Sequence, residues 1–297
     1  MALELTRESD VDEITRRSGR GMWQRFRRHR LSLLGIAILA VFAFGSIFAP
    51  WLSFHDPNYV DLDQIKDPPS LDHLLGTDSA GRDVWARLLF GSRVTLVIAA
   101  CALIIGVFIG STIGLVSGYF GGWIDNLLMR FTELVMTFPQ LFALIILVSI
   151  IGGSVFNIMW IIGILGWTGI ARLVRGQVLM IREMEYVTAA GALGASDWRI
   201  LTSHILPATM PYVAVAGTLG LASAILIEAA LNFLGLGVQI PTPTWGNMMT
   251  AAQSIHVIQN EPWLWIPPGL AIALTVLAVN FVGDGIRDAL DPRIQIE

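Results

Sequence analysis

The sequence predicts an all-α protein that crosses a membrane several times. Hydrophobic residues make up 54% of its 297 positions and charged residues only 14%, whereas a soluble domain is usually about 25% charged. Apolar runs of about 20 residues, the length of a helix that spans a bilayer, recur along the chain. We expect six spans, at residues 31–50, 94–118, 127–151, 155–173, 212–234 and 264–283.

The first span follows a polar segment, residues 1–30, that ends in a basic cluster. Its apolar run is longer than the roughly 7–15 residues of a signal peptide, so we expect it to stay in the mature protein. Most Lys and Arg residues lie before this span, between spans four and five, or in the tail, residues 285–297. Because basic residues favour the cytoplasmic side, both termini are predicted to be cytoplasmic. The basic cluster is interpreted as a topology anchor, with docking to a partner or to anionic lipid as the alternative.

The chain lacks the residues of a nucleotide-binding or hydrolytic site. Its one lysine, Lys66, lies in QIKDPP, whereas a P-loop needs Gly-x-x-x-x-Gly-Lys-Ser/Thr. The sequence has no His-Glu-x-x-His helix, no Gly-x-Ser-x-Gly turn and a single cysteine, Cys101. We therefore expect no catalytic residue, no bound cofactor and no metal site, and any ATP hydrolysis must take place on another chain. The lack of an external His/Cys cluster argues in the same direction against direct metal contact.

The five later spans, residues 93–284, are expected to form one helical core. Glycine recurs at every fourth position of the second span, which places these residues on one helix face where another backbone can approach closely. We interpret the stripe as a packing surface rather than as part of a pore; its members are Gly106, Gly110, Gly114 and Gly118. In the third span, Pro139 removes one backbone hydrogen bond and is expected to kink the helix.

The clearest deep acid is Glu228 in the fifth span, followed one helical turn later by Asn232. An ionisable group inside a membrane points to function by default, so both residues are candidates for a solute pathway or its gate. The alternative is a local, hydrogen-bonded packing pair.

Two segments are predicted to face the outside. In the loop 51–92, Asp83 is expected to cap a short helix, Val84–Phe90, on the membrane surface. This is either a capped interfacial helix or a landing surface for an external partner; the contact candidates are Asp78, Arg82, Asp83 and, in the second segment, Trp245. That second segment, residues 235–263, is interrupted by prolines and forms a gate or a partner contact, unless its tryptophans only anchor it at the interface.

The loop 176–211 between spans four and five is expected to contain two short helices on the cytoplasmic side. Its core reads EYVTAAGALGASDWRILTSHILP from residue 185. The first helix, Tyr186–Leu193, ends where Gly194 lets the chain turn; the second, Trp198–Ile205, is expected to end at Pro207. Connections between bundle helices are usually about 2–8 residues long. A longer helical hairpin indicates a docking element for a cytoplasmic protein.

At these residues the chain resembles the permease subunits of ABC importers. Their signature is Glu-Ala-Ala, three residues, Gly, nine residues, an apolar residue, any residue and Leu-Pro. Here the segment from Thr188 to Ala190, then Gly194 and Pro207, keep that spacing, while Thr188 replaces the usual Glu and His204 the usual Ile. The chain is similar in particular to the dipeptide/oligopeptide/nickel "C" permeases, through LGTDSAGRD, EYVTAAGALGASDWRI, LNFLGLGVQIPTPTWG and GDGIRDALDPR.

The resemblance implies an importer in a bacterial or archaeal plasma (inner) membrane. The partners implied are a homologous second permease in a heterodimer, two cytoplasmic ATPase subunits that carry ATP and Mg²⁺, and an extracytoplasmic solute-binding protein; no nucleic acid is expected. It further implies di- or oligopeptides as substrate, with nickel or another small solute as the alternative. The residues that would couple the permease to the ATPases are Tyr186, Thr188, Ala189, Ala190, Gly194, Asp197, Arg199, His204 and Pro207.

Two other functions remain open at this point. A self-sufficient ion-coupled carrier or channel would transport as a single chain on an ion gradient, but it usually shows several ion-coordinating groups near the midplane. A membrane anchor or sensor whose hairpin recruits an enzyme would show no solute flux. The hairpin and the missing nucleotide site together favour the ABC permease.

Overall fold

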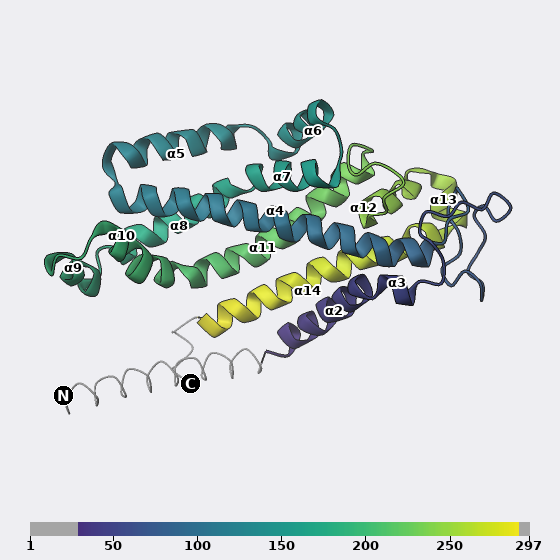
Figure 1. Cartoon of the computed structure of the whole chain (residues 1–297), viewed down its shortest axis with the longest axis horizontal. Coiled ribbons are helices and arrows are strands. Elements are labelled where there is room, and N and C mark those ends of the chain that lie inside the picture. The colour runs from purple at the N-terminus through teal and green to yellow at the C-terminus, as the bar shows by residue number, and fades with distance from the viewer. Residues whose placement is uncertain (1–28, 291–297) are drawn as a thin grey trace.

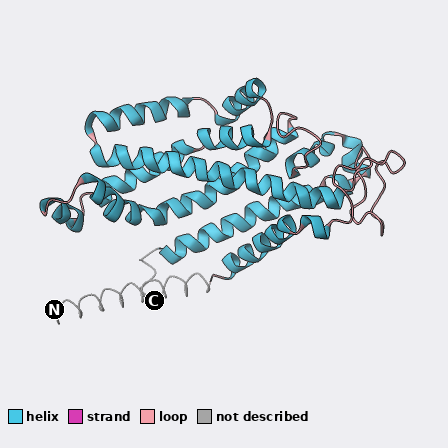
Figure 2. Ribbon diagram, viewed as in Figure 1, coloured by secondary structure: helices cyan, strands magenta, loops and turns pink. Residues whose placement is uncertain are grey.

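The computed structural model describes residues 29–290, which form an elongated bundle of helices (Figure 1). No strand occurs within these residues (Figure 2). Most of the predicted N-terminal segment and the end of the C-terminal tail lie outside the described residues. The helices are α2 (Arg30–Ile47), α3 (Ala49–Leu52), α4 (Val84–Phe120), α5 (Gly122–Thr137), α6 (Gln140–Ile151), α7 (Val155–Leu165), α8 (Trp167–Ile181), α9 (Glu185–Ala192), α10 (Asp197–Ile200), α11 (Leu206–Phe233), α12 (Trp245–Met248), α13 (Ile255–Asn260) and α14 (Ile266–Leu290). Three shorter helical turns adjoin them: the π-helical turn η1 (Leu201–Ile205) and the 3₁₀ turns η2 (Met249–Gln253) and η3 (Pro262–Leu264).

Several of these helices are long and apolar enough to cross a membrane. Within residues 29–290, five segments meet this criterion: Arg30–Ile47, Val84–Phe120, Val155–Ile181, Asp197–Phe233 and Ile266–Ala289. The pair α5 and α6 counts as a sixth only if it is one broken span, because the two helices meet at a bend of 82°. The bend lies at Pro139, which precedes the first residue of α6 and has extended backbone angles (φ −58°, ψ 119°). Proline cannot continue the hydrogen-bond ladder, so the expected kink is a complete break.

Helix α4 corrects the prediction of a separate interfacial helix. Asp83 caps its start as expected, since the Asp83 Oδ1 accepts a hydrogen bond from the Ala86 backbone N at 2.6 Å. The helix then continues without interruption for 37 residues. Gly91 and Ser92, which follow the predicted end of the short helix, are buried, and the Ser92 hydroxyl bonds back to the Leu89 carbonyl at 2.6 Å within the helix. The segment Val84–Phe90 is therefore the beginning of the second span.

Helix α4 lies at the centre of the bundle, in contact with α7 and α8 on one side and α11 on the other, while α14 packs between α11 and α2 (Figure 1). The glycine stripe of α4 faces α8. A Cβ added at Gly110 would lie 2.7 Å from the Trp167 carbonyl oxygen, and one at Gly114 would lie 2.7 Å from that of Ala171. No side chain fits at these distances, so the absence of side chains is what lets the two backbones meet.

Helix α5 is held to the same unit by an ion pair. The guanidinium of Arg175 in α8 donates two hydrogen bonds to the Asp125 carboxylate, each 2.6 Å long. Two parallel charge-assisted bonds of this kind fix orientation as well as distance. Helices α4, α5 and α8 are thus joined close to the end of the bundle where α9 and α10 lie.

The second hairpin helix corrects another prediction, because it does not end at Pro207. Helix α10, η1 and α11 follow one another without a gap and form a single candidate span, Asp197–Phe233. The turn η1 is π-helical, so its hydrogen bonds reach one residue further than in an α-helix. Pro207 lies in the first turn of α11, where a proline costs little because the regular hydrogen-bond pattern is already displaced.

The close contact of α4 with α8 generates a stability prediction. Gly114→Ala should lower the melting temperature of the purified protein, because forcing an extra methyl group into a packed site costs about 1–3 kcal/mol. Gly217→Ala in α11 is the matched control, since a Cβ there meets nothing within 4 Å and alanine favours a helix over glycine by about 0.5–1 kcal/mol. Equal effects of the two changes on the melting temperature would contradict this packing.

Candidate functional site

The predicted hairpin forms α9 and α10, which lie at one end of the bundle, opposite α12, α13 and the long loop 53–83 (Figure 1). Gly194 has φ +85°, a backbone conformation that side chains rarely adopt, and it reverses the chain between the two helices. Ser196 caps α10 by accepting a hydrogen bond from the Arg199 backbone N at 3.4 Å. The sequence therefore builds a defined helical corner here rather than a loose connection.

Apolar contacts and one hydrogen bond anchor this corner to the bundle. Val187 of α9 and Ile200 of α10 are buried in one cluster with Val174 and Val178 of α8. The Tyr119 hydroxyl, near the end of α4, donates a hydrogen bond to the Asp197 carboxylate at 2.7 Å. A displacement of the corner must therefore move α8 and the end of α4 with it.

The outer side of the corner exposes large apolar side chains. Leu193 is 89% exposed and Trp198 is 75% exposed, although both belong to ordered elements or their caps. Large apolar groups that are exposed on an ordered element are typical of an interaction site. Neither residue was among the predicted coupling residues. The feature of the sequence that could have indicated them is the presence of a tryptophan and a leucine in a hairpin that the rest of the chain leaves uncovered.

None of the predicted coupling residues is fully buried. The Thr188 hydroxyl bonds back to the Glu185 carbonyl at 3.0 Å, within its own helix. The His204 ring lies against the Tyr186 ring, with centroids 6.3 Å apart. Ala190 is half-buried, and the exposed members are Tyr186, Thr188, Ala189, Gly194, Asp197, Arg199 and Pro207.

At the opposite end, Asp78 and Arg82 form a half-buried ion pair. The Arg82 Nε donates to the Asp78 carboxylate at 2.8 Å, and the buried Arg87 guanidinium lies 3.5 Å from the same oxygen. Arg87 also donates to the Pro57 carbonyl at 3.1 Å. These side chains and Lys66 line a hollow of about 490 Å³. Arg87 was not among the candidates selected from the sequence. The predicted helix on the membrane surface contains Arg87, and an arginine there is expected to be exposed.

Asp83 and Trp245, two of the candidates for an outer partner contact or a gate, are buried within this chain. Asp83 is 4% exposed and caps α4, while Trp245 has no exposed surface. The indole Nε1 of Trp245 donates to the Leu88 carbonyl at 3.1 Å, and its backbone N donates to the Thr95 hydroxyl at 3.2 Å. A capping box between Thr244 and Asn247 starts α12 at Trp245, whose ring is buried in the bundle.

Glu228 and Asn232 belong to the same buried network. The Asn232 amide donates to the Glu228 carboxylate at 2.6 Å, and the Asn232 side-chain oxygen accepts a hydrogen bond from the Val238 backbone N at 2.7 Å. The Thr95 hydroxyl of α4 lies 3.4 Å from the other Glu228 oxygen. Both residues are essentially without exposed surface. This geometry favours the packing alternative over the pathway alternative for the pair.

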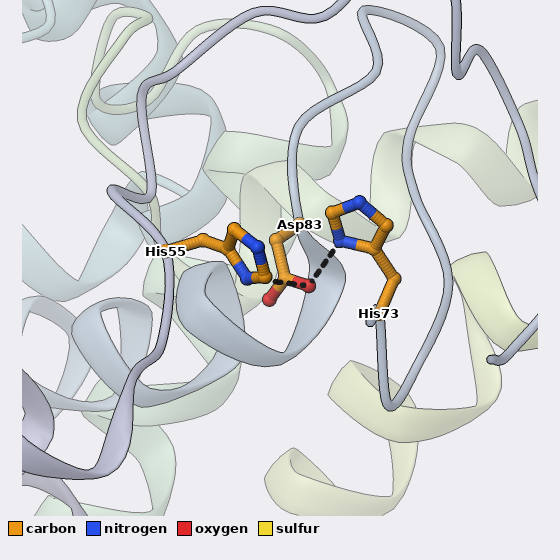
Figure 3. A group of neighbouring side chains, drawn as sticks. All are labelled: His55, His73 and Asp83. Atoms are coloured by element: carbon orange, nitrogen blue, oxygen red, sulfur yellow. Dashed lines mark hydrogen bonds and ion pairs between the residues drawn. The ribbon is translucent and has the colours of Figure 1, made fainter. Parts of the chain in front are cut away.

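The expected absence of a histidine cluster is wrong. His55 and His73 both face the Asp83 carboxylate (Figure 3), and one ligand atom from each of the three residues lies within 4.8 Å of the others. The three positions are far apart in the sequence, which carries no metal-ligand spacing there. Only the folding of the long loop back onto α4 brings them together.

Two family models match this chain. The one described as "Binding-protein-dependent transport system inner membrane component" matches residues 110–296, which is more than half of the sequence. The chain belongs to this family. A second model, the N-terminal TM domain of oligopeptide transport permease C, matches residues 19–69 of the permease. The chain is thus a multi-pass inner-membrane component of an ABC importer that works with separate ATPase and solute-binding subunits.

Relatives of this permease cover nearly its full length. A protein of Brucella suis biovar 1 named as a peptide permease is 41% identical over 273 residues, 92% of this chain and 90% of the relative. The glutathione transport system permease protein GsiD of Pectobacterium atrosepticum is 40% identical over 286 residues, 96% of this chain and 94% of the relative. GsiD of Escherichia coli O6 is 40% identical over 274 residues, which are 92% of this chain and 90% of the relative.

The buried network generates a second stability prediction. Asn232→Ala should lower the melting temperature, because it leaves the Val238 N–H and the Glu228 carboxyl group without their partner, and an unpaired buried polar group costs about 1–3 kcal/mol. Ser223→Ala on the same helix is the control, since the exposed Ser223 hydroxyl bonds only to the Leu219 carbonyl. If Asn232→Ala melts like the Ser223 variant, the network does not hold α11 and α12 together.

Proposed function

We propose that this permease forms one half of the translocation pathway of a peptide importer. We further propose that α9 and α10 transmit the conformational change of the ATPase subunits to its membrane-spanning helices. The observation that carries the proposal is the corner formed by these helices: it is anchored to α8 and α4 on its inner side and presents Leu193 and Trp198 on its outer side. An element of this kind needs a partner to cover its apolar side chains. The ATPase subunits of the family supply one.

The anchoring defines a route for motion through the chain. A push on α10 acts on α4 through the Tyr119–Asp197 bond and on α8 through the shared apolar cluster. The Arg182 guanidinium of the α8 C-cap donates to the Gly118 carbonyl at 2.9 Å, which joins α4 and α8 again at this end. The continuous helical segment Asp197–Phe233 extends from the corner to the buried Glu228 network. Rigid, closely packed helices carry a displacement better than loops.

The solute pathway is proposed to lie between this chain and a homologous second permease. A mostly apolar hollow of about 440 Å³ opens between α4, α8 and α11, and its polar lining residues include Gln140, Thr168 and Ser223. Such a surface suits a peptide, whose amide groups need hydrogen bonds while its side chains vary. Glu228 and Asn232 then support the pathway from behind rather than line it.

The topology completes the proposal. The proposed arrangement has six spans, with α5 and α6 as one broken span, and has both termini and the α9–α10 corner in the cytoplasm. The distribution of basic residues supports it. The loop 53–83 and the segment with α12 and α13 then face outward, where the solute-binding protein docks near Asp78 and Arg82. ATP and Mg²⁺ are bound and used on two separate ATPase chains, and this chain binds no cofactor for the reaction.

Substrate preference is proposed from the relatives. One is named for peptides and two for glutathione, which is itself a tripeptide. Di- and oligopeptides are therefore the favoured class.

The coupling role is tested by crosslinking. In a Cys101→Ala background, Ala189→Cys should form a crosslink with an ATPase subunit in native membranes, and ATP should alter its yield. Phe108→Cys, an exposed position in the middle of α4, is the control and should give no such product. With both variants folded and inserted, absence of an ATPase product from Ala189→Cys and from Leu193→Cys would refute the proposed docking site.

A functional prediction follows from the exposed leucine. Leu193→Asp should reduce ATP-dependent uptake and recovery of the ATPase subunits with the permease by about tenfold or more, because burying a leucine contributes about 1.5–3 kcal/mol and each 1.4 kcal/mol is a factor of ten in affinity. Leu71→Asp is the matched control, since Leu71 is 97% exposed on the opposite loop. Equal recovery of ATPase with both variants would count against α9 and α10 as the coupling element.

A further inference from the structure

We propose that His55, His73 and Asp83 form a binding site for a divalent transition metal ion, with Zn²⁺ as the best match (Figure 3). The site lies on the long loop between α3 and α4, away from the α9–α10 corner. It stands on the geometry of these residues alone and does not depend on the proposed transport function.

The ligand atoms are already close to the spacing that zinc needs. The His73 Nδ1 lies 2.8 Å from the Asp83 Oδ2, and the His55 Nδ1 lies 3.7 Å from the same oxygen. Tetrahedral Zn²⁺ with bonds of about 2.0–2.1 Å separates its ligand atoms by roughly 3.3–3.4 Å. Changes of about half an ångström bring these two distances to that value, and the two histidine ligand atoms lie within 4.8 Å of each other. Two imidazoles and one carboxylate are a ligand set that zinc accepts.

The hydrogen bonds around the cluster orient the ligands toward one point. The His73 Nε2 lies 2.6 Å from the Gln64 side-chain oxygen, which accepts a hydrogen bond when that nitrogen carries the proton. In a neutral His73 the lone pair is then on Nδ1, where it faces an oxygen of Asp83. Two lone pairs at this distance require a proton or a metal ion between them. Metal-bound histidines commonly donate their other N–H to an oxygen in this way.

Asp83 is held just as firmly. Its Oδ1 accepts the capping hydrogen bond from the Ala86 N at 2.6 Å, which leaves Oδ2 directed at the two histidines. The carboxylate is 4% exposed, whereas the His73 and His55 side chains are 13% and 37% exposed. The inner ligand is thus fixed by the start of α4, and the site opens to solvent on the His55 side, through which an ion can enter.

The electrostatic surroundings favour a cation. A hollow of about 260 Å³ adjoins the cluster, and its lining includes the acidic residues Asp56, Asp61 and Asp72 as well as the three ligands. No Lys or Arg occurs among the described residues that line it. The hollow leaves room for a water molecule as the fourth ligand, as in zinc sites with three protein ligands.

A metal ion here would brace the loop. His55 lies just after α3, His73 lies in the loop, and Asp83 is the N-cap of α4, so one ion would join three separate points of the chain. The loop has little apolar core of its own, since large side chains such as Leu62 and Leu71 are 72% and 97% exposed. Closing a long loop with a metal clip restricts the unfolded chain and stabilises the fold. The brace also sets the position of Asp78 and Arg82 on the same loop.

The test is a zinc titration of the purified full-length chain in detergent, stripped of metal by a chelator and freed of any polyhistidine tag. The wild type should bind one Zn²⁺ per chain in competition with a chromogenic chelator, and its melting temperature should rise with zinc. His55→Ala and His73→Ala should each bind zinc at least about tenfold more weakly and lose the zinc-dependent rise. His256→Ala, which removes an exposed histidine 3.8 Å from Glu261, is the matched control and should bind like the wild type.

A second variant separates metal binding from folding. Asp83→Asn keeps a side-chain oxygen for capping α4, because asparagine caps as well as aspartate, but it removes the negative ligand. It should fold with nearly the wild-type melting temperature without zinc and bind zinc more weakly. With Co²⁺ as the probe, the wild type should show the intense visible absorption of a four-coordinate ion. Zinc affinity that is undetectable, or equal in the wild type, His55→Ala and Asp83→Asn, would reduce the cluster to a hydrogen-bond network and overturn the proposal.

Discussion

The backbone contact between α4 and α8 is the constraint on which the rest of the structure depends. Gly110, Gly114 and Gly118 remove the side chains that would hold the helices apart, and carbonyl groups and Val174 of α8 fill the space. Because α8 leads directly into α9, this contact positions the exposed corner. Because α4 begins at Asp83, the same helix positions the outer loop. The corner at one end of the bundle and the outer loop at the other are therefore both positioned by this one pair of helices.

The far end of α4 is tied to α11 and α12 by polar groups instead. Thr95 links α4 to both Glu228 and the Trp245 backbone, and Asn232 closes the network onto Val238. Inside an apolar bundle such bonds are costly to break, because no water replaces the lost partner. The apolar interface and the polar one hold α4 at opposite ends, so the helix connects two regions of different chemistry.

Local patterns predicted the elements well, and tertiary packing decided where they end. The Asp83 cap, the break at Pro139, the turn at Gly194 and the glycine stripe follow from short-range chemistry that the sequence displays. The continuity of α4 through Gly91 and Ser92 does not, because both residues are buried and Gly91 packs against the backbone of the distant Thr244. The burial of Trp245 and the meeting of His55 with His73 likewise depend on contacts between distant segments, for which a single sequence offers no periodic signal. Leu193 and Trp198 became candidates only when their exposure was known.

The wide turn η1 gives the segment Asp197–Phe233 a property that a regular helix lacks. A π-helical turn contains one residue more than the α-helical turn it replaces, so everything on one side of it is rotated by about 100° relative to the other side. The faces of α10 and α11 therefore cannot be aligned by counting in steps of three and four across Leu201–Ile205. If the π-helical turn were to rearrange into regular α-helix, its extra residue would lengthen the helical segment by about 1.5 Å. The end of the segment would rotate at the same time, and the helix would stay continuous.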